Sequence, residues 1–336
     1  MQTTIDTRAL MSQLVMGFVP AQAIAVAAEL GLADHLANGP KTAGELAALT
    51  GSHERSLFRL LRFLASLGIF RADEQQRFSL TPLAELLASD APDSMRSMAR
   101  IMGRCGPGTV SGLLNGVRNG TCPFDEAFGA PLFDWLGARP EDAALFDAAM
   151  TGFHGPETAA VLEAYPLDGI STLADIGCGN GSALSAALRR YPSMKGLFFD
   201  QAHVIERMRR QVEGDGLAGR CEFASGSFFD AVPTGADGYF MRHIIHDWTD
   251  DLSRTILTNV RRAIPATGRL LLVEMVVPED NEPSLAKAFD VTMMLFPNGM
   301  ERTEREYRTL LREAGFDLTG VTPTASPVSV IEARPV

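Results

Sequence analysis

The chain of 336 residues is long enough for two domains and a sizeable core. Hydrophobic residues make up 46% and charged residues 21%, an ordinary globular composition that excludes wholesale disorder. A formal net charge of −11 weighs against non-specific binding to nucleic acid or to an anionic membrane.

The sequence shows no membrane-spanning segment, no secretory signal and no cysteine motif. No apolar run approaches the roughly 20 residues that span a bilayer. The N-terminus lacks the basic region, apolar core and cleavage site of a secretory signal. The four cysteines form no CxxC pair, so neither a disulfide framework nor a zinc site is indicated. These features predict a cytoplasmic protein.

The first predicted element is a helical pattern over Leu14–Leu36. Ala, Leu and Val occupy more than one face of it, as in a helix that is buried nearly all round. In a segment near the N-terminus, such burial indicates a covering partner surface and hence an oligomer. A core helix of the same chain is the alternative.

Residues 41–80 predict a winged-helix unit. Helices over Thr42–Ala48 and His53–Leu67 are followed, after Gly68, by two short strands joined at Asp73–Gln76. The longer helix carries three arginines on one face, as DNA recognition would require: Arg55, Arg59 and Arg62. However, residues 41–77 hold six basic and four acidic residues, a small surplus that favours a solvated face on a scaffold domain.

Helices continue to residue 153. Thr81 and Pro82 open one helix, Ser94–Asn115 forms another that glycines and Pro107 interrupt, and Gly116–Phe128 is expected to be loop. Two more helices are predicted over Pro131–Gly137 and Pro140–Phe153. They carry an aromatic and Met stripe typical of a core, or of a lid over a pocket: Phe133, Trp135, Phe146, Met150 and Phe153.

Beyond Leu167 strands and helices alternate, which predicts a parallel, doubly wound sheet. Strands are expected at Thr172–Ile176, Lys195–Phe199, Cys221–Ala224, Gly238–Arg242 and Arg269–Val276. The helices between them are expected at Ser182–Arg190, Val204–Glu213 and Asp251–Ala263. Ligands of such sheets bind outside the carboxyl ends of the strands, so the residues at those ends are the candidates.

The first strand ends in the pattern DxGxGxG, from Asp175 to Gly181. Glycines suit a tight turn and let a ligand approach the backbone, and the following helix presents free N–H groups. The dinucleotide fingerprint is GxGxxG, so the third glycine falls one residue early. The turn therefore favours a nucleoside without a pyrophosphate over NAD or FAD, with a purely structural turn as the alternative.

The next strand ends carry further nucleoside contacts. Asp200, some twenty residues beyond the glycines, is placed to accept ribose hydroxyls. Ser227 and Phe228 follow the third strand and suit the edge and face of an adenine ring. No phosphate-binding lysine is called for, so a sulfonium nucleoside fits the set.

The fourth strand ends in MRHIIHDW, which supplies a candidate base. His246, followed by Asp247, is placed at the strand end, and its near-neutral pKa suits proton removal from a phenol. His243 points elsewhere if the strand continues. Two histidines three apart could ligate a metal, but the nearby carboxylates complete no HExxH-type pattern. Glu274 and Glu301 could orient the ring and stabilise its cation.

Five segments together carry a resemblance to a known family: LADIGCGNG, FDQAHVIE, MRHIIHDW, LLVEMVV and NGMERT. Their order and spacing resemble those of the S-adenosylmethionine-dependent O-methyltransferases of the caffeate and hydroxyindole type, including bacterial enzymes of antibiotic and pigment biosynthesis. The resemblance runs over nearly the whole chain, since those proteins also begin with a dimerising winged-helix domain.

The resemblance implies an α/β fold with a Rossmann-like, doubly wound methyltransferase domain at residues 166–336. A mostly helical winged-helix dimerisation domain at residues 1–100 and a helical linker with substrate-pocket helices at residues 101–165 would precede it. It also implies S-adenosylmethionine as cofactor, a small aromatic hydroxylated substrate, and a homodimer formed through the N-terminal domain.

Site residues are carried over by position. The catalytic base falls on His246, with Glu274, Glu301 and Asp247 around it. The cofactor contacts fall on Asp175, Gly177, Gly179, Asp200, Ser227, Phe228 and Arg242. The acceptor wall falls on Trp135, Met150, Phe153, Asp290, Met293 and Met294.

One position departs from the family. Its adenine loop reads GDxF, and here Ser227 replaces the acidic residue. An uncharged acceptor binds an exocyclic amine more weakly than a carboxylate does, which puts cofactor affinity in question.

Three hypotheses follow. The leading one is metal-independent methyl transfer to an aromatic hydroxyl with His246 as general base. The second is a relative that binds the cofactor but catalyses hydroxylation or decarboxylation. The third, from another class, is a winged-helix DNA-binding regulator, which the net acidity disfavours.

Overall fold

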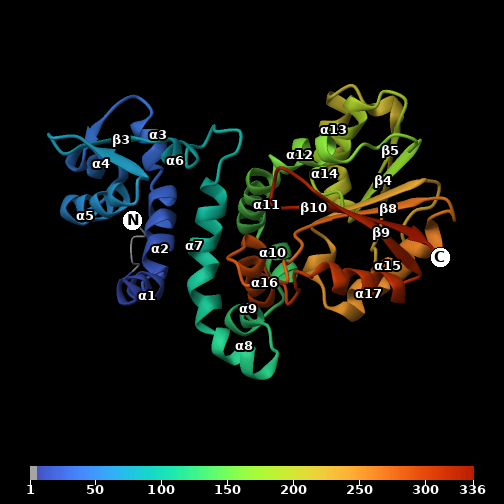
Figure 1. The fold of residues 1–336 in the computed structure, drawn as a ribbon. Helices are drawn as coiled ribbons and strands as arrows, with labels where there is room; N and C mark the ends of the chain where they lie inside the picture. The colour runs from blue at the N-terminus through green and yellow to red at the C-terminus, as the bar shows by residue number, and fades with distance from the viewer. Residues whose placement is uncertain (1–5) are drawn as a thin grey trace, which may run out of the picture. The chain divides into compact units, whose positions relative to one another are not determined.

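The computed structural model describes residues 6–336. They form two compact units (Figure 1). The first unit comprises the residues up to Val110 together with Asp134–Gly155, and the second comprises Ser111–Phe133 and Pro156–Val336. The three-part division at residues 100 and 165 stays a prediction.

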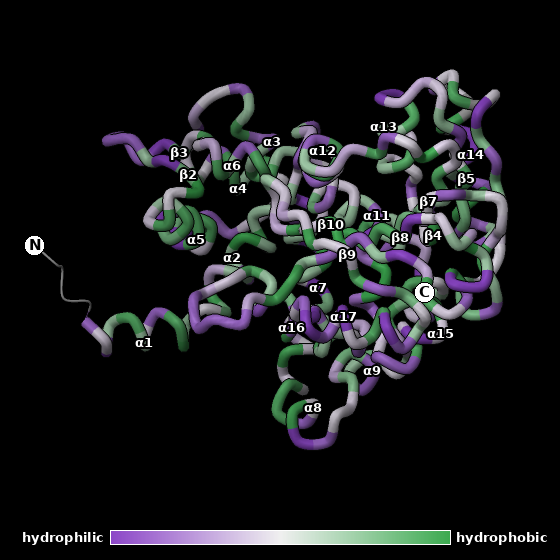
Figure 2. Tube along the Cα trace, turned by 45° about the vertical axis from the view of Figure 1, so that its right-hand side comes forward, coloured by the Kyte–Doolittle hydropathy of each residue, from purple (hydrophilic) through white to green (hydrophobic). Residues whose placement is uncertain are grey.

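The N-terminal helical pattern is divided into α1 (Thr7–Val15), α2 (Phe18–Glu29) and α3 (Leu32–Leu36). The prediction of one long helix is wrong because Gly31 takes a left-handed conformation (φ 62°), which ends α2. Burial nearly all round is also wrong within one chain, since α1 contains no buried residue and α2 buries only alanines. Figure 2 shows hydrophobic residues along α1.

Among residues 6–336 no single helix has the length and apolarity to cross a bilayer. Only α1 and α2 taken as a pair pass on length and composition, and they are bent by 45°.

The winged-helix prediction is confirmed in its elements. They are β1 (Lys41–Thr42), α4 (Ala43–Thr50), α5 (Glu54–Ser66), β2 (Phe70–Ala72) and β3 (Arg77–Leu80), with sheet order β1-β3-β2. Thr42 and Glu45 form a capping box that starts α4. The apolar face of α5 packs into the core through Leu57, Leu61 and Leu64. Its three arginines are exposed.

The next helices are α6 (Pro82–Glu85), α7 (Arg96–Ser111), α8 (Leu113–Asn119), α9 (Pro123–Phe128), α10 (Leu132–Gly137) and α11 (Pro140–His154). Thr81 caps α6 as predicted. However, α7 runs without a break through Gly103 and Pro107 and ends at Ser111, and most of the expected loop belongs to α8 and α9. Helix α9 begins at Pro123 and ends before Gly129, which is left-handed. Both residue types are common in loops, so their composition alone predicted a loop where they mark the two ends of a short helix.

The second unit contains a seven-stranded sheet of order β6-β5-β4-β7-β8-β10-β9. Five strands are parallel and lie where they were predicted: β4 (Thr172–Ile176), β5 (Lys195–Asp200), β6 (Cys221–Ser225), β7 (Gly238–Arg242) and β8 (Arg269–Glu274). The antiparallel strands β9 (Phe316–Pro323) and β10 (Ser329–Pro335) were not predicted.

Besides α8 and α9, this unit includes the helices α12 (Glu157–Ala164), α13 (Ser182–Arg190), α14 (Ala202–Gly214), α15 (Asp250–Ala263), α16 (Leu285–Leu295) and α17 (Glu304–Glu313). The chain crosses from β4 to β5 on one side and to β7 on the other. Strand β4 is therefore the switch point of the sheet, where α/β proteins bind ligands beyond the carboxyl ends of the strands. The doubly wound architecture is confirmed (Figure 1).

Candidate active site

The glycine turn after β4 divides into packing and open positions. All three glycines have positive φ: Gly177 (77°), Gly179 (54°) and Gly181 (71°). A Cβ on Gly177 would lie 2.4 Å from Cδ1 of Ile244, and one on Gly181 would lie 2.9 Å from Cγ of Met208. A Cβ on Gly179 would meet nothing within 4 Å. Gly179 thus faces open space that a ligand can enter against bare backbone.

Two aspartates flank this turn. Asp175 is 2% exposed, and its Oδ2 has no hydrogen-bond partner among the described residues. Burial raises the pKa of Asp175 to about 7, although Arg242 opposes the shift. Asp200 accepts hydrogen bonds from the N–H groups of Gly179 (2.9 Å) and Gln201 (2.7 Å), and burial raises its pKa. The orphaned Asp175 oxygen is an acceptor available to a ligand donor.

The loop after β6 meets the segment after β7 through aromatic rings. Ser227 accepts a hydrogen bond from the N–H of Phe229 (3.2 Å). The rings of Phe228 and Phe229 meet Trp248 edge-on, at 6.0 and 4.8 Å between centroids. Arg242, at the end of β7, donates to Thr158 Oγ1 (2.8 Å). The predicted cofactor residues therefore lie at one edge of the sheet.

His246 sits in a one-turn 3-10 helix, η2 (Ile245–Asp247), and is 5% exposed. Its Nδ1 hydrogen-bonds to Oε1 of Glu301 (2.7 Å) and lies 3.7 Å from Oε2 of Glu274. Its Nε2 lies 3.5 Å from Oδ1 of Asp247. The structure thus brings together all four predicted catalytic residues, which come from three segments of the chain: η2, the end of β8 and the segment before α17.

The carboxylates dominate the electrostatics of this cluster. Burial alone would lower the pKa of His246, but Glu274, Asp247 and Glu301 outweigh it and raise that pKa to about 10. Burial raises the pKa of Asp247 to about 6 and that of the fully buried Glu274 to about 7, with His246 opposing both shifts. Glu274 Oε1 accepts the N–H groups of Ile244 and Ile245, which ties η2 to the end of β8.

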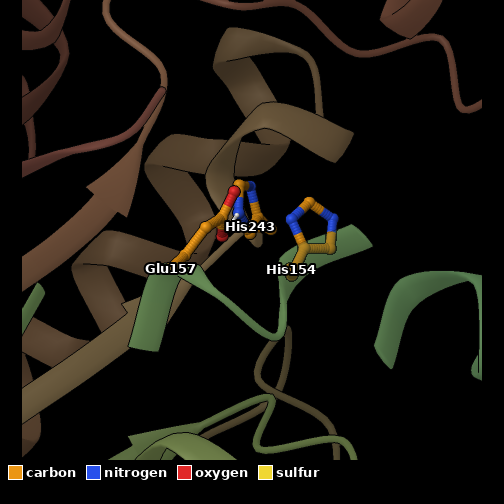
Figure 3. A group of neighbouring side chains, drawn as sticks. All are labelled: His154, Glu157 and His243. Carbon is orange, nitrogen blue, oxygen red and sulfur yellow. Dashed lines mark hydrogen bonds and ion pairs between the residues drawn. The ribbon is translucent and has the colours of Figure 1, made fainter. Parts of the chain in front are cut away.

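His243 lies beside His246, so the expectation that it points away from the site is wrong. Strand β7 stops at Arg242, and His243 takes a left-handed conformation (φ 53°) that breaks the strand alternation. Its Nε2 hydrogen-bonds to Oε2 of the buried Glu157 (2.7 Å; Figure 3), and its ring centroid is 5.1 Å from that of His246. Glu157, which starts α12, escaped the sequence analysis because nothing in its surroundings marks it.

The two histidines and Glu274 offer potential ligand atoms within 4.8 Å of one another. One ring nitrogen of each histidine is hydrogen-bonded to a carboxylate: Nδ1 of His246 to Glu301 and Nε2 of His243 to Glu157. This arrangement orients imidazoles for proton transfer.

The predicted acceptor residues divide between the two units. Asp290, Met293 and Met294 lie on α16 in the second unit, where Asp290 Oδ1 accepts the N–H of Glu301 (3.1 Å). The remaining three lie in the first unit: Trp135 on α10, and Met150 and Phe153 on α11.

Comparisons with known proteins agree with the site. A family model for an O-methyltransferase domain matches residues 111–317, and one for an O-methyltransferase dimerisation domain matches residues 12–90. The chain is 40% identical over 332 residues to phenazine O-methyltransferase PhzM of Lysobacter antibioticus, and this match covers 99% of this chain and 97% of that protein.

Two solved structures extend the similarity. That of LaPhzM matches with a TM-score of 0.93 and 40% identity, over 99% of this chain and all of that one (100%). The O-methyltransferase NcsB1 from neocarzinostatin biosynthesis, in complex with S-adenosyl-L-homocysteine and 1,4-dihydroxy-2-naphthoic acid, matches with a TM-score of 0.84 and 30% identity, over 99% and 100%. The chain belongs to the S-adenosylmethionine-dependent O-methyltransferase family.

Proposed function

We propose that this enzyme methylates a hydroxyl group of an aromatic or polycyclic secondary metabolite with His246 as general base and without a metal ion. The observation that carries the proposal is the buried hydrogen bond between Nδ1 of His246 and Glu301, which leaves Nε2 as the nitrogen for a substrate proton. S-adenosylmethionine supplies the methyl group, whose bond to the sulfonium sulfur breaks as the acceptor oxygen bonds to carbon.

The proton is the part of the reaction that this chain handles. Nε2 of His246 takes it from the hydroxyl as the oxygen attacks, and the imidazolium that results is stabilised by Glu274 and Glu301. The base must start neutral, whereas the carboxylates hold its pKa at about 10. A cationic ligand in the same pocket opposes protonation, so cofactor binding lowers the pKa of His246 toward the neutral range.

The cofactor residues follow from the same edge of the sheet. We assign the nucleoside contacts to Asp175, Gly177, Gly179, Asp200, Ser227, Phe228 and Arg242. The orphaned oxygen of Asp175 and the open space at Gly179 support this assignment. Ser227 is the weaker acceptor at the adenine end.

The acceptor wall is assigned to Trp135, Met150, Phe153, Asp290, Met293 and Met294. Methionine adapts to flat ligands of varied outline, which suits an aromatic acceptor. We also infer a homodimer formed through the N-terminal unit. The match to a dimerisation domain and the large exposed apolar residues of α1, including Leu10, Met11 and Leu14, support it.

The test is product mass with hydroxylated phenazines and naphthoic acids as acceptors. A gain of one methyl group per hydroxyl is expected, with S-adenosylhomocysteine formed in equal amount and the rate unchanged after dialysis against a chelator. A gain of oxygen, a loss of carbon dioxide or a rate that disappears with the metal would overturn the proposal.

A further inference from the structure

Arg302 is the largest charged side chain that is buried among the described residues of the second unit. It is 1% exposed and follows Glu301 directly in sequence. Its guanidinium donates six hydrogen bonds to acceptors on five residues: Ile245 O (3.1 Å), Trp248 O (2.9 Å), Asp250 Oδ1 (2.9 and 2.8 Å), Ser253 Oγ (3.3 Å) and Met300 O (3.4 Å). All three nitrogens of the guanidinium therefore donate hydrogen bonds.

These acceptors bracket the catalytic base. Ile245 precedes His246 and Trp248 follows Asp247, so Arg302 holds the backbone of η2 at both of its ends. The return contact is made by Met300, whose N–H donates to His246 O (2.8 Å). The segment that carries the base and the segment that carries Glu301 are therefore joined on both sides of the side-chain pair.

The two segments approach closely where no side chain intervenes. A Cβ on Gly299 would lie 2.0 Å from His246 O, a distance that only glycine permits. The backbone of Arg302 is fixed in turn, because its carbonyl accepts the N–H of Val277 (3.0 Å). Arg302 is therefore bonded through its backbone to the segment after β8 and through its guanidinium to both ends of η2.

We propose that Arg302 is a positioning residue that sets the distance between Nδ1 of His246 and Glu301 for proton removal; this inference rests on the proposed role of His246. A fork of five N–H groups can reach both ends of η2 at once, whereas an ammonium group acts as a point donor. The charge is balanced by Asp250, the first residue of α15, whose side chain is 57% exposed and does not enter the site.

The consequence is specific to the protonated acceptor. When Arg302 is replaced by Lys, the charge and most of the volume remain, but η2 loses at least one of its two carbonyl contacts. The His246 and Glu301 pair then loses its fixed geometry, which general base catalysis requires. An acceptor whose hydroxyl is already ionised needs no base and escapes the effect.

The experiment measures Arg302→Lys on two acceptors of similar shape, one with a phenol pKa near 10 and one ionised at the assay pH. We expect kcat on the first to fall about 10- to 100-fold, on the second less than threefold, with the Kd for S-adenosylhomocysteine changed less than threefold. The matched control is Arg305→Lys, because Arg305 is 80% exposed and pairs with Glu279 on the surface.

His246→Gln is measured beside it to separate the two claims. If His246→Gln keeps its rate on the protonated acceptor, the proposed function fails. If it loses that rate and Arg302→Lys does not, or if Arg302→Lys loses rate equally on both acceptors, the positioning role fails alone. Where Arg302→Lys does not fold, Asp250→Asn takes its place. Its kcat is expected to fall three- to tenfold on the protonated acceptor only. An equal loss on both acceptors, or no loss on either, would overturn the positioning role.

Discussion

Glu301→Gln tests the orientation of the catalytic base. The substitution keeps the size of the side chain but replaces a charged acceptor at 2.7 Å from Nδ1 of His246 by a neutral one. Hydrogen bonds to charged groups contribute about 1.5–3 kcal/mol, and the lower half of that range separates a charged from a neutral acceptor here. At 1.4 kcal/mol for each factor of ten, we expect kcat to fall about 10- to 40-fold.

The assay is initial-rate kinetics at saturating cofactor, with the KM for the acceptor measured in parallel. The KM is expected to stay within threefold, because Glu301 acts on the base and not on ligand binding. Glu332→Gln is the matched control, since Glu332 is bonded to Tyr165 and Arg334 outside the site. A kcat for Glu301→Gln within twofold of the wild type would refute the role of this hydrogen bond.

Three further predictions concern the cofactor edge. Asp175 has a pKa of about 7 in the folded protein, raised from 3.8, so its contribution to stability is present below pH 3.8 and is lost as the pH rises through 7. In denaturant titrations, the free energy of unfolding of Asp175→Asn should therefore gain about 4 kcal/mol relative to the wild type between low pH and pH 8. A difference between the two proteins that does not change with pH would contradict this. Gly177→Ala should lose stability through the strain of a left-handed backbone and through contact with Ile244. Gly179→Ala should lose only about 1 kcal/mol of stability to the backbone strain, but its affinity for S-adenosylhomocysteine should fall at least tenfold. Equal effects of the two variants on binding and on Tm would count against the open space at Gly179. Ser227→Asp should tighten S-adenosylhomocysteine binding about three- to tenfold in calorimetry, and unchanged affinity would remove Ser227 from the adenine contact.

The sequence was most informative where local chemistry decides the structure. The glycines after β4 and the amphipathic run behind them predicted α13 at its observed bounds, Ser182–Arg190. Strand β7 was likewise predicted at Gly238–Arg242, because a short apolar run between turn signals suffices to mark a buried parallel strand. The strand ends then placed the candidate residues at one edge of the sheet.

The sequence was least informative where distant contacts decide. Strand β10 pairs antiparallel with β8 and β9 pairs antiparallel with β10, so both strands are placed by partners far away in the sequence. His243 escapes because a single left-handed residue reverses the direction that strand alternation would give it. Arg302 reads as a solvated charge, since its burial depends on oxygen acceptors about fifty residues earlier.

The N-terminal helices show the same limit in another form. Composition alone suggested a helix buried on all sides, but α1 has no buried residue in the single chain. Its apolar residues, among them Leu14 and Val15, are exposed and available to a second copy. The apolar composition of a helix thus does not identify the surface that covers it.

The most direct test of the account is the transfer rate of His246→Gln as a function of pH, with an acceptor of phenol pKa near 10. Gln keeps much of the shape of His246 but cannot take a proton, so the rate at pH 7 should fall at least 100-fold and should rise with pH as the acceptor ionises in solution. Single-turnover measurement separates this step from product release. A variant that matches the wild-type rate at pH 7 would contradict general base catalysis by His246.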